Sequence, residues 1–402
     1  MYSIKYFVFT LIFTFITGCG GGAAGLSSTL GPPVSQAAHY DLAEGTPDSR
    51  GAPFAGIFST GAAQVGVITL MGRNISSYTA LTTGPTLQQP SPEVLTAWNA
   101  GWTGQGQNIL MFDAYANIAT CSDAPGSSNE CHGLHAMLIS GLVAPYAGLF
   151  GLDSSLTTVA RVGVSGANLT AHNNIDVVNI SYGFTPCNSG CGGTPAESDF
   201  AALTATSSAR NANVVTMLNT TTNAYKASNL AQAVIVKSAG NALQDAKYDT
   251  TTVALVENAN IAARLLVVGA LDKNGSTSNP ASADTFIGTN LKYSNYAGTN
   301  TAISDRFVLA YGRDPYESMS SAFNGTPSPV GQGTSYAAPR VAGYAAILLQ
   351  KFPNLDAIKT SAIILDTARY DTLTCHPNCN PAVWGRGEAS LSRALAPVGF
   401  LR

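Results

Sequence analysis

Charged residues are scarce in this chain of 402 amino acids. Asp, Glu, Lys and Arg supply 11% of the sequence, against about 25% in an average soluble domain, and Ser, Thr, Asn and Gly take their place. Such a composition is typical of exported proteins. Clusters of Lys or Arg are also lacking, and 20 basic against 23 acidic residues leave a net charge of −3. We therefore expect no nucleic acid as a partner.

The start of the sequence has no apolar run long enough to cross a bilayer, which takes about 20 residues. Residues 6–16 are mostly apolar, follow Lys5 and precede the small residues Thr17 and Gly18. This order of charge, apolar stretch and small residues predicts a cleaved export signal over residues 1–18.

The cysteine that follows this signal stands in a distinctive setting. Residues 15–22 read FITGCGGG and resemble the lipobox of bacterial lipoproteins. The resemblance implies that Cys19 becomes the mature N-terminus and carries a diacylglycerol on its sulfur, and Gly20 points to the outer membrane of a Gram-negative bacterium. We expect an exported protein anchored to the cell envelope, or released from it after processing. The open alternative is an ordinary secretory peptide with an incidental cysteine.

Six further cysteines fall into three pairs that are close in sequence. Close pairs suit small disulfides formed in an oxidising compartment. A zinc site is the competing interpretation, because His132 and His376 each lie beside a cysteine, although no four-ligand spacing is present. The expected disulfides are Cys121–Cys131, Cys187–Cys191 and Cys375–Cys379.

The chain changes character near residue 92. Residues 19–92 are rich in Gly, Ser, Thr, Ala and Pro, with one strand-like stretch at 64–71, and are interpreted as a tether or a short propeptide. Residues 93–402 are interpreted as one domain, since 45% hydrophobic content in a chain of this length can bury a large core. No repeat with a fixed period is present.

Within this domain, short apolar β-rich runs alternate with helical stretches. Such a pattern predicts an α/β fold with a mainly parallel central sheet and helices on both faces. Open parallel sheets bind ligands at the carboxyl ends of their strands, so polar groups that end strands or begin helices are expected to converge there. Strands are predicted at 108–112, 157–164, 176–181, 233–238, 265–270 and 307–310, and helices include 132–143, 198–211 and 335–351.

A serine lies at the start of the last of these helices. Residues 333–343 read GTSYAAPRVAG, and the backbone N–H of Ser335 is placed near the positive end of the helix dipole, where an oxyanion is stabilised. In isolation Gly-Thr-Ser is typical of an ordinary helix N-cap. The whole run resembles the active-site serine signature of the subtilases. This resemblance implies a subtilisin-like fold, serine endopeptidase activity and Ser335 as the nucleophile.

A histidine motif fits the same family. Residues 132–138, HGLHAML, resemble the subtilase segment that carries the general base, with His132 in that position. Two histidines three apart on a helix are otherwise metal ligands or core groups. Three neighbours depart from the Thr, Val and Gly usual in the family, namely Leu134, Ala136 and Leu138.

An aspartate ends the apolar strand before that histidine. Residues 108–114, NILMFDA, place Asp113 where subtilases carry the carboxylate that orients the imidazole and stabilises its cation. Ala114 and Tyr115 follow where the family has a small residue and then Gly. In isolation a strand-terminal Asp is a turn residue or helix cap.

Two further segments resemble subtilase landmarks. Residues 233–241, AVIVKSAGN, resemble the strand that leads to the oxyanion-hole asparagine, so Asn241 is expected to act beside the N–H of Ser335; otherwise it is a turn residue. Residues 176–183, DVVNISYG, resemble the strand that pairs with the substrate. This strand and the residues before Asn241 are expected to form the two walls of the specificity pocket. Because these walls are small and neutral, we expect apolar or aromatic substrate residues before the scissile bond. The expected wall residues are Ser181, Tyr182 and Gly183 on one side and Ser238, Ala239 and Gly240 on the other.

Two other function classes compete with a subtilase. An α/β-hydrolase esterase needs Gly-x-Ser-x-Gly and the order Ser, acid, His, whereas this chain has Ala337 and the order Asp113, His132, Ser335. A non-enzymatic surface lipoprotein on a degenerate protease fold is the second hypothesis. The subtilase resemblance implies polypeptide substrates, a monomer and no cofactor for the chemistry, with structural calcium expected in many members but not placeable on this sequence.

Overall fold

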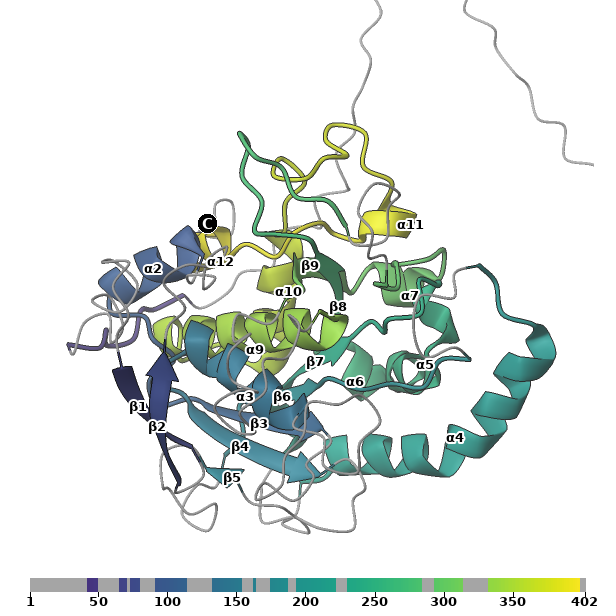
Figure 1. The fold of residues 1–402 in the computed structure, drawn as a ribbon, viewed down its shortest axis with the longest axis horizontal. Coiled ribbons are helices and arrows are strands. Elements are labelled where there is room, and N and C mark those ends of the chain that lie inside the picture. The colour runs from purple at the N-terminus through teal and green to yellow at the C-terminus, as the bar shows by residue number, and fades with distance from the viewer. Residues whose placement is uncertain are drawn as a thin grey trace, which may run out of the picture. The chain divides into compact units, whose positions relative to one another are not determined.

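A seven-stranded sheet with helices packed against it forms the described part of the chain (Figure 1). The computed structural model describes residues 42–49, 65–70, 73–79, 91–113, 132–153, 162–163, 174–186, 193–221, 230–283, 293–313 and 332–397. All of them belong to one compact unit, Ala37–Arg402. The predictions for the export signal, for Cys19 and for four of the paired cysteines, Cys121, Cys131, Cys187 and Cys191, lie outside the described residues.

The sheet has the strand order β5-β4-β3-β6-β7-β8-β9. All neighbouring strands are parallel except β5, which is antiparallel to β4. The predicted α/β class with a mainly parallel sheet is therefore confirmed. The strands are β3 (Asn108–Asp113), β4 (Gly148–Asp153), β5 (Val162–Gly163), β6 (Val177–Ile180), β7 (Val234–Ser238), β8 (Leu265–Leu271) and β9 (Phe307–Tyr311).

One edge of the sheet differs from the sequence prediction. Strand β4 was not predicted, because its sequence GLFGLD contains two glycines, which weaken the strand pattern. The strand predicted at 157–164 is described only at Val162–Gly163, and its parallel direction was wrong. Residues 154–161 between β4 and β5 are too few for a parallel connection, which takes a dozen or more residues.

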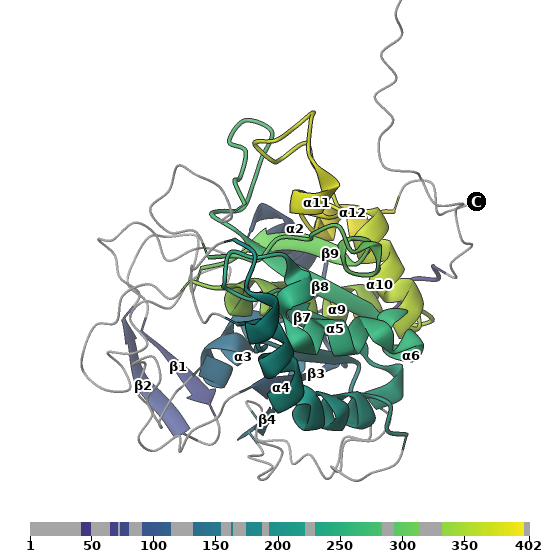
Figure 2. The same cartoon turned by 90° about the vertical axis from the view of Figure 1, so that its right-hand side faces the viewer.

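Helices cover both faces of the sheet (Figure 2). On β3, Ile109 and Met111 face one core and Leu110 and Phe112 face the other, as alternation along a strand requires. The first core contains α2 (Pro92–Asn99), α3 (His132–Val143), α9 (Thr334–Lys351), α10 (Ala357–Asp366) and α12 (Leu391–Leu395). The second contains α4 (Glu197–Leu218), α5 (Thr250–Glu257), α6 (Ala259–Ala262), α7 (Thr301–Ser304) and α11 (Pro381–Trp384).

Helices α3 and α9 pack closely against each other (Figure 1). A Cβ added at Gly343 of α9 would lie 2.6 Å from the Cβ of Val143 on α3. The hydroxyl of Ser140 on α3 donates to the carbonyl oxygen of Pro339 on α9 at 2.7 Å. Both helices begin within a residue of their predicted starts. Within the described residues, no helix has the combination of length and apolarity that a membrane span requires.

Part of the N-terminal segment lies against this domain. The amide of Gly45 donates to the carbonyl oxygen of Lys351 at 2.7 Å, and Glu44 pairs with the Lys351 ammonium at 3.1 Å. The carboxylate of Asp48 accepts a hydrogen bond from the Thr103 hydroxyl at 3.1 Å. We call residues 42–49 the docked segment. Further along, β1 (Val65–Leu70) pairs antiparallel with β2 (Arg73–Thr79), a strand that the sequence did not predict.

Candidate active site

Asp113 and His132 meet at the carboxyl end of the sheet. Asp113 is the last residue of β3 and is buried, and His132 is the first residue of α3. The His132 Nδ1 and the Asp113 Oδ1 lie 2.8 Å apart. A hydrogen bond from Nδ1 to the carboxylate makes Nε2 the basic nitrogen of the ring. The ring of Tyr336 packs beside the imidazole, with 5.8 Å between the ring centroids, and helps to fix its position.

Ser335 lies in the first turn of α9. The N-cap residue Gly333 offers no side-chain hydrogen bond to this turn, so no N-cap side chain competes for its backbone N–H groups. The serine carbonyl accepts a hydrogen bond from the Ser181 hydroxyl at 3.1 Å. Ser181 in turn accepts one from the Asn179 side-chain amide at 2.7 Å, so strand β6 and helix α9 are fixed to each other beside the serine.

Asn241 reaches the same place from the loop after β7. Its Oδ1 accepts hydrogen bonds from the backbone N–H of Thr334 at 2.9 Å and from the Thr334 hydroxyl at 3.0 Å. These two bonds fix the orientation of the amide. The position of a Cβ added at Gly333 would lie 3.3 Å from Asn241 Nδ2 and 3.1 Å from Ser335 Oγ. The amide donor and the serine hydroxyl therefore converge on one small space beside Gly333.

One cavity of about 240 Å³ brings these groups together. Its lining includes Asp113, His132, Asn241 and Ser335, which all come from the carboxyl ends of strands or from helix starts, as the topology predicts. Of the expected wall residues, the lining includes Ser181, Tyr182, Gly183, Ser238 and Gly240. The Ala239 side chain is instead buried in the core that contains α4 and α5.

Tyr182 is a neutral member of this wall. Burial is the main reason why the pKa of its phenol is raised, and the negative charges of Asp113 and Asp249 add to the shift. The Arg210 guanidinium lies 5.4 Å from the centroid of its ring, a cation–π contact on one side of the wall.

The sequence did not reveal Asp249, which also lines the cavity. Asp249 is fully buried and forms an ion pair with the fully buried Lys237 at 3.1 Å. Two signals were present in the sequence. Lys237 interrupts the apolar run AVIVKSAGN, and a buried lysine needs a partner. Asp249 precedes three threonines as a helix N-cap does, but nothing in the sequence shows that the two residues meet.

A second, larger cavity lies at the amino ends of the strands. It has a volume of about 750 Å³, and Gln232, Asp176 and Arg264, which precede β7, β6 and β8, are among its lining residues. It holds none of the nucleophile, base or oxyanion groups described above. The choice of the smaller cavity as the candidate active site therefore rests on the convergence of complementary groups and not on volume.

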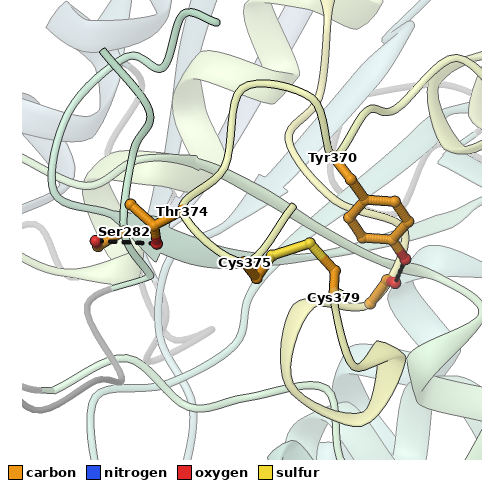
Figure 3. Close-up of a disulfide and its surroundings, with 6 residues drawn as sticks. Ser282, Tyr370, Thr374, Cys375 and Cys379 are labelled. Atoms are coloured by element: carbon orange, nitrogen blue, oxygen red, sulfur yellow. Dashed lines mark hydrogen bonds between the residues drawn. A yellow bond between two sulfur atoms is a disulfide. The ribbon is translucent and has the colours of Figure 1, made fainter. Parts of the chain in front are cut away.

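The predicted Cys375–Cys379 disulfide is present between α10 and α11 (Figure 3). Beside it, the hydroxyls of Thr374 and Ser282 lie 3.2 Å apart, and the Tyr370 hydroxyl donates to the Gly385 carbonyl oxygen. Because the two sulfurs are bonded to each other, they do not serve as zinc thiolates. In the part of the chain that the structure describes, no three His, Cys, Asp or Glu side chains group as metal ligands.

Comparison with known proteins places this geometry in context. The family model described as "Subtilase family" matches residues 120–390. This range contains His132, Asn241 and Ser335 and begins just after Asp113. No curated protein matches the chain.

Several solved structures are similar to the chain at low sequence identity. A structure of the prenylagaramide maturation protease PagA is 16% identical, with 76% of this chain and 98% of that chain covered and a TM-score of 0.42. A cold adapted subtilisin-like serine proteinase is 17% identical, with 73% and 90% covered and a TM-score of 0.38. A serine protease of Aeromonas sobria is 17% identical, with 77% and 63% covered and a TM-score of 0.44.

Proposed function

This chain belongs to the subtilase family of serine proteases, and on that basis we propose that it is an endopeptidase whose triad is Asp113, His132 and Ser335. One observation carries the proposal. The 2.8 Å contact between Asp113 and His132 lies in the same cavity as Ser335 and Asn241. A nucleophile, a base held by a carboxylate and an oxyanion donor are the groups that acyl transfer needs.

The first half of the reaction forms an acyl-enzyme. Ser335 Oγ attacks the carbonyl carbon of the scissile peptide bond while His132 Nε2 takes its proton. Asn241 Nδ2 and the N–H of Ser335 stabilise the oxyanion of the tetrahedral intermediate. The C–N bond then breaks, and the leaving amine takes the proton from His132. Asp113 stays ionised and stabilises the imidazolium.

The second half returns the enzyme to its starting state. A water molecule gives a proton to His132 and attacks the ester carbonyl of the acyl-enzyme, and the same donors stabilise the second oxyanion. The C–O bond to Ser335 breaks, and His132 returns the proton to the serine oxygen. The substrate is held as an added strand along Ser181, Tyr182 and Gly183.

Replacing the nucleophile tests this proposal. Ser335→Ala is expected to lower kcat by about 10⁶-fold and to abolish labelling by a fluorophosphonate, with the melting temperature almost unchanged. Ser208→Ala, at an exposed position of α4, is the matched control and should keep both the hydrolysis of casein and the reaction with the label. Casein hydrolysis by Ser335→Ala at the wild-type rate contradicts the assignment. A folded wild type that neither reacts with the label nor cleaves casein favours the non-enzymatic lipoprotein instead.

We also propose that the enzyme is exported and anchored by a lipid on Cys19. The support is the order of residues 1–20, in which Lys5, an apolar stretch and FITGCGGG follow one another. The anchor would keep a peptidase at the cell envelope, where polypeptide substrates meet it outside the cytoplasm.

A further inference from the structure

A buried ion pair lies beside the substrate cavity. Lys237 on β7 and Asp249 before α5 are both fully buried, with 3.1 Å between Nζ and Oδ2, and Asp249 is part of the cavity lining. Removing two charges from water costs several kcal/mol per ion before their attraction is counted. A well-packed apolar pair would avoid this cost, so the position of the pair beside the cavity indicates a role in binding.

The two carboxylate oxygens of Asp249 have different partners. Oδ1 accepts hydrogen bonds from the backbone N–H groups of Thr251 at 2.9 Å and Thr252 at 3.0 Å, which caps helix α5. Oδ2 accepts from Lys237. It also lies directly behind Gly183, where an added Cβ would be only 1.8 Å from it. Since a carboxylate oxygen can accept more than one hydrogen bond, Oδ2 is placed to attract a cation that enters the cavity.

Hydrogen bonds connect the pair to both walls of the cavity. The Lys237 ammonium also donates to the carbonyl oxygen of Ser238, on one wall. Thr250 follows Asp249 in the sequence, and its backbone amide donates to the carbonyl oxygen of Phe184 at 2.9 Å. Phe184 directly follows the other wall, which ends at Gly183. Burial lowers the pKa of the Lys237 ammonium, and the charge of Asp249 opposes this shift. Lys237 and the residue after Asp249 thus hold the pair in position beside the cavity.

We propose that Lys237 neutralises the Asp249 carboxylate in the lining of the substrate cavity, so that the enzyme cleaves after uncharged residues and rejects Lys and Arg at that position. This inference rests on the proposed peptidase function. A substrate cation would have to approach the Lys237 ammonium at low effective dielectric, where like charges repel strongly. A substrate carboxylate would likewise be repelled by the negative charge of Asp249. An uncharged substrate side chain is repelled by neither residue.

Peptides that differ only in the residue before the scissile bond test this inference. With wild type, we expect kcat/KM for Lys to be at least about tenfold below that for Gln. Lys237→Met leaves Asp249 unpaired. It should raise the Lys:Gln ratio, which is kcat/KM for the Lys peptide divided by kcat/KM for the Gln peptide, about tenfold or more. Asp249→Asn leaves the lysine unpaired and should raise the Glu:Gln ratio instead. The double variant Lys237→Met/Asp249→Asn should restore both ratios to values close to those of wild type.

Lys247→Met is the matched control. It removes a lysine that pairs with Asp245 at 3.5 Å at the surface, and it should leave both ratios unchanged. An unchanged Lys:Gln ratio in folded Lys237→Met overturns the inference. If Lys237→Met does not fold, unchanged ratios in Asp249→Asn, or a double variant that cleaves the Lys peptide as well as the Gln peptide, overturn it instead. If wild type cleaves none of the peptides and resists the fluorophosphonate, the proposed function fails, and this inference fails with it.

Discussion

At the scale of single residues, the space beside Gly333 joins the two groups to which the proposed mechanism assigns the reacting carbonyl. The position of a Cβ on residue 333 lies 3.1 Å from Ser335 Oγ and 3.3 Å from Asn241 Nδ2. Both distances are shorter than the usual contact between non-bonded heavy atoms. The φ of Gly333 is 170°, an extended conformation that any residue adopts. The glycine is therefore needed for space and not for its backbone freedom.

Gly333→Ala is expected to lower kcat about 10²-fold, because a methyl group displaces the hydroxyl and the amide by a fraction of an ångström. The free energy of unfolding should change by less than about 1 kcal/mol, since the backbone is unstrained. Steady-state kinetics on one peptide and urea unfolding measure the two effects. An alanine variant with the kcat of wild type shows that this space is not used in the reaction.

Residues of the proposed site were predictable from sequence to different degrees. Ser335 lies in a run that resembles the subtilase signature along its whole length, and Asp113 ends a clear apolar strand. Lys237 and Asp249 were not found, because the functional unit is a contact between a strand and a helix cap that are separate in sequence. A buried lysine is visible in the sequence, but its partner is visible only in three dimensions.

At the scale of elements, the fit between α3 and α9 controls how His132 faces Ser335. Each helix begins at or beside one of these residues, and the two pack closely where Gly343 meets Val143. Protein interiors are packed densely enough that one extra methyl group is felt. A change at this crossing therefore alters the position of both helices, although the contact is more than two helical turns from Ser335.

Gly343→Ala is expected to destabilise the fold by about 1–3 kcal/mol, because the new Cβ would lie 2.6 Å from Val143 and the core is already filled. It should also lower kcat/KM. Gly141→Ala on α3 is the matched control. Its Cβ would meet only the Leu149 Cδ1, at 3.1 Å, and helix propensity favours alanine by about 1 kcal/mol. Urea unfolding of both variants compares them, and equal effects on stability would contradict this account of the crossing.

Elements with a continuous apolar pattern were predicted well and the others were not. Strands β3, β6, β7, β8 and β9 are buried along almost their whole length, so most of their residues are apolar. Strand β4 contains two glycines and β2 reads RNISSYT, so neither shows the pattern. Their positions depend on pairing with a neighbouring strand, which a pattern along one strand does not reveal.

At the scale of the whole molecule, the chain before the catalytic domain contacts that domain at one described segment. The docked segment, residues 42–49, contacts the end of α9 through Gly45 and Glu44. Only residues 20–41 separate this segment from Cys19, so the length of chain between the proposed lipid and the domain is shorter than the full segment 19–92. Whether 19–92 persists as a tether or leaves as a propeptide stays a prediction.

Cys19→Ala is expected to move the enzyme from the membrane fraction to the soluble fraction, because the thiol proposed to receive the diacylglycerol is gone. Membrane fractionation and mass spectrometry of the mature N-terminus measure this. The double variant Cys19→Ala/Ser335→Ala, which lacks the proposed nucleophile, should also be soluble, which excludes self-cleavage as the cause of release. Wild-type cells that release a shortened, active, soluble enzyme would rule out the tether and indicate a removed propeptide.

Helix α9 also determines how the molecule carries mechanical load. Its first turn holds Ser335, and its last residue, Lys351, fastens the docked segment. At about 1.5 Å per residue these two points lie roughly 24 Å apart along the helix. A pull on the chain before Leu42 would therefore act on the contacts of the docked segment, which include those of Gly45 and Glu44 with Lys351, at the end of α9 away from Ser335. In the proposed lipid-anchored form, tension on the N-terminus would reach the domain at this end of the helix and not at the serine.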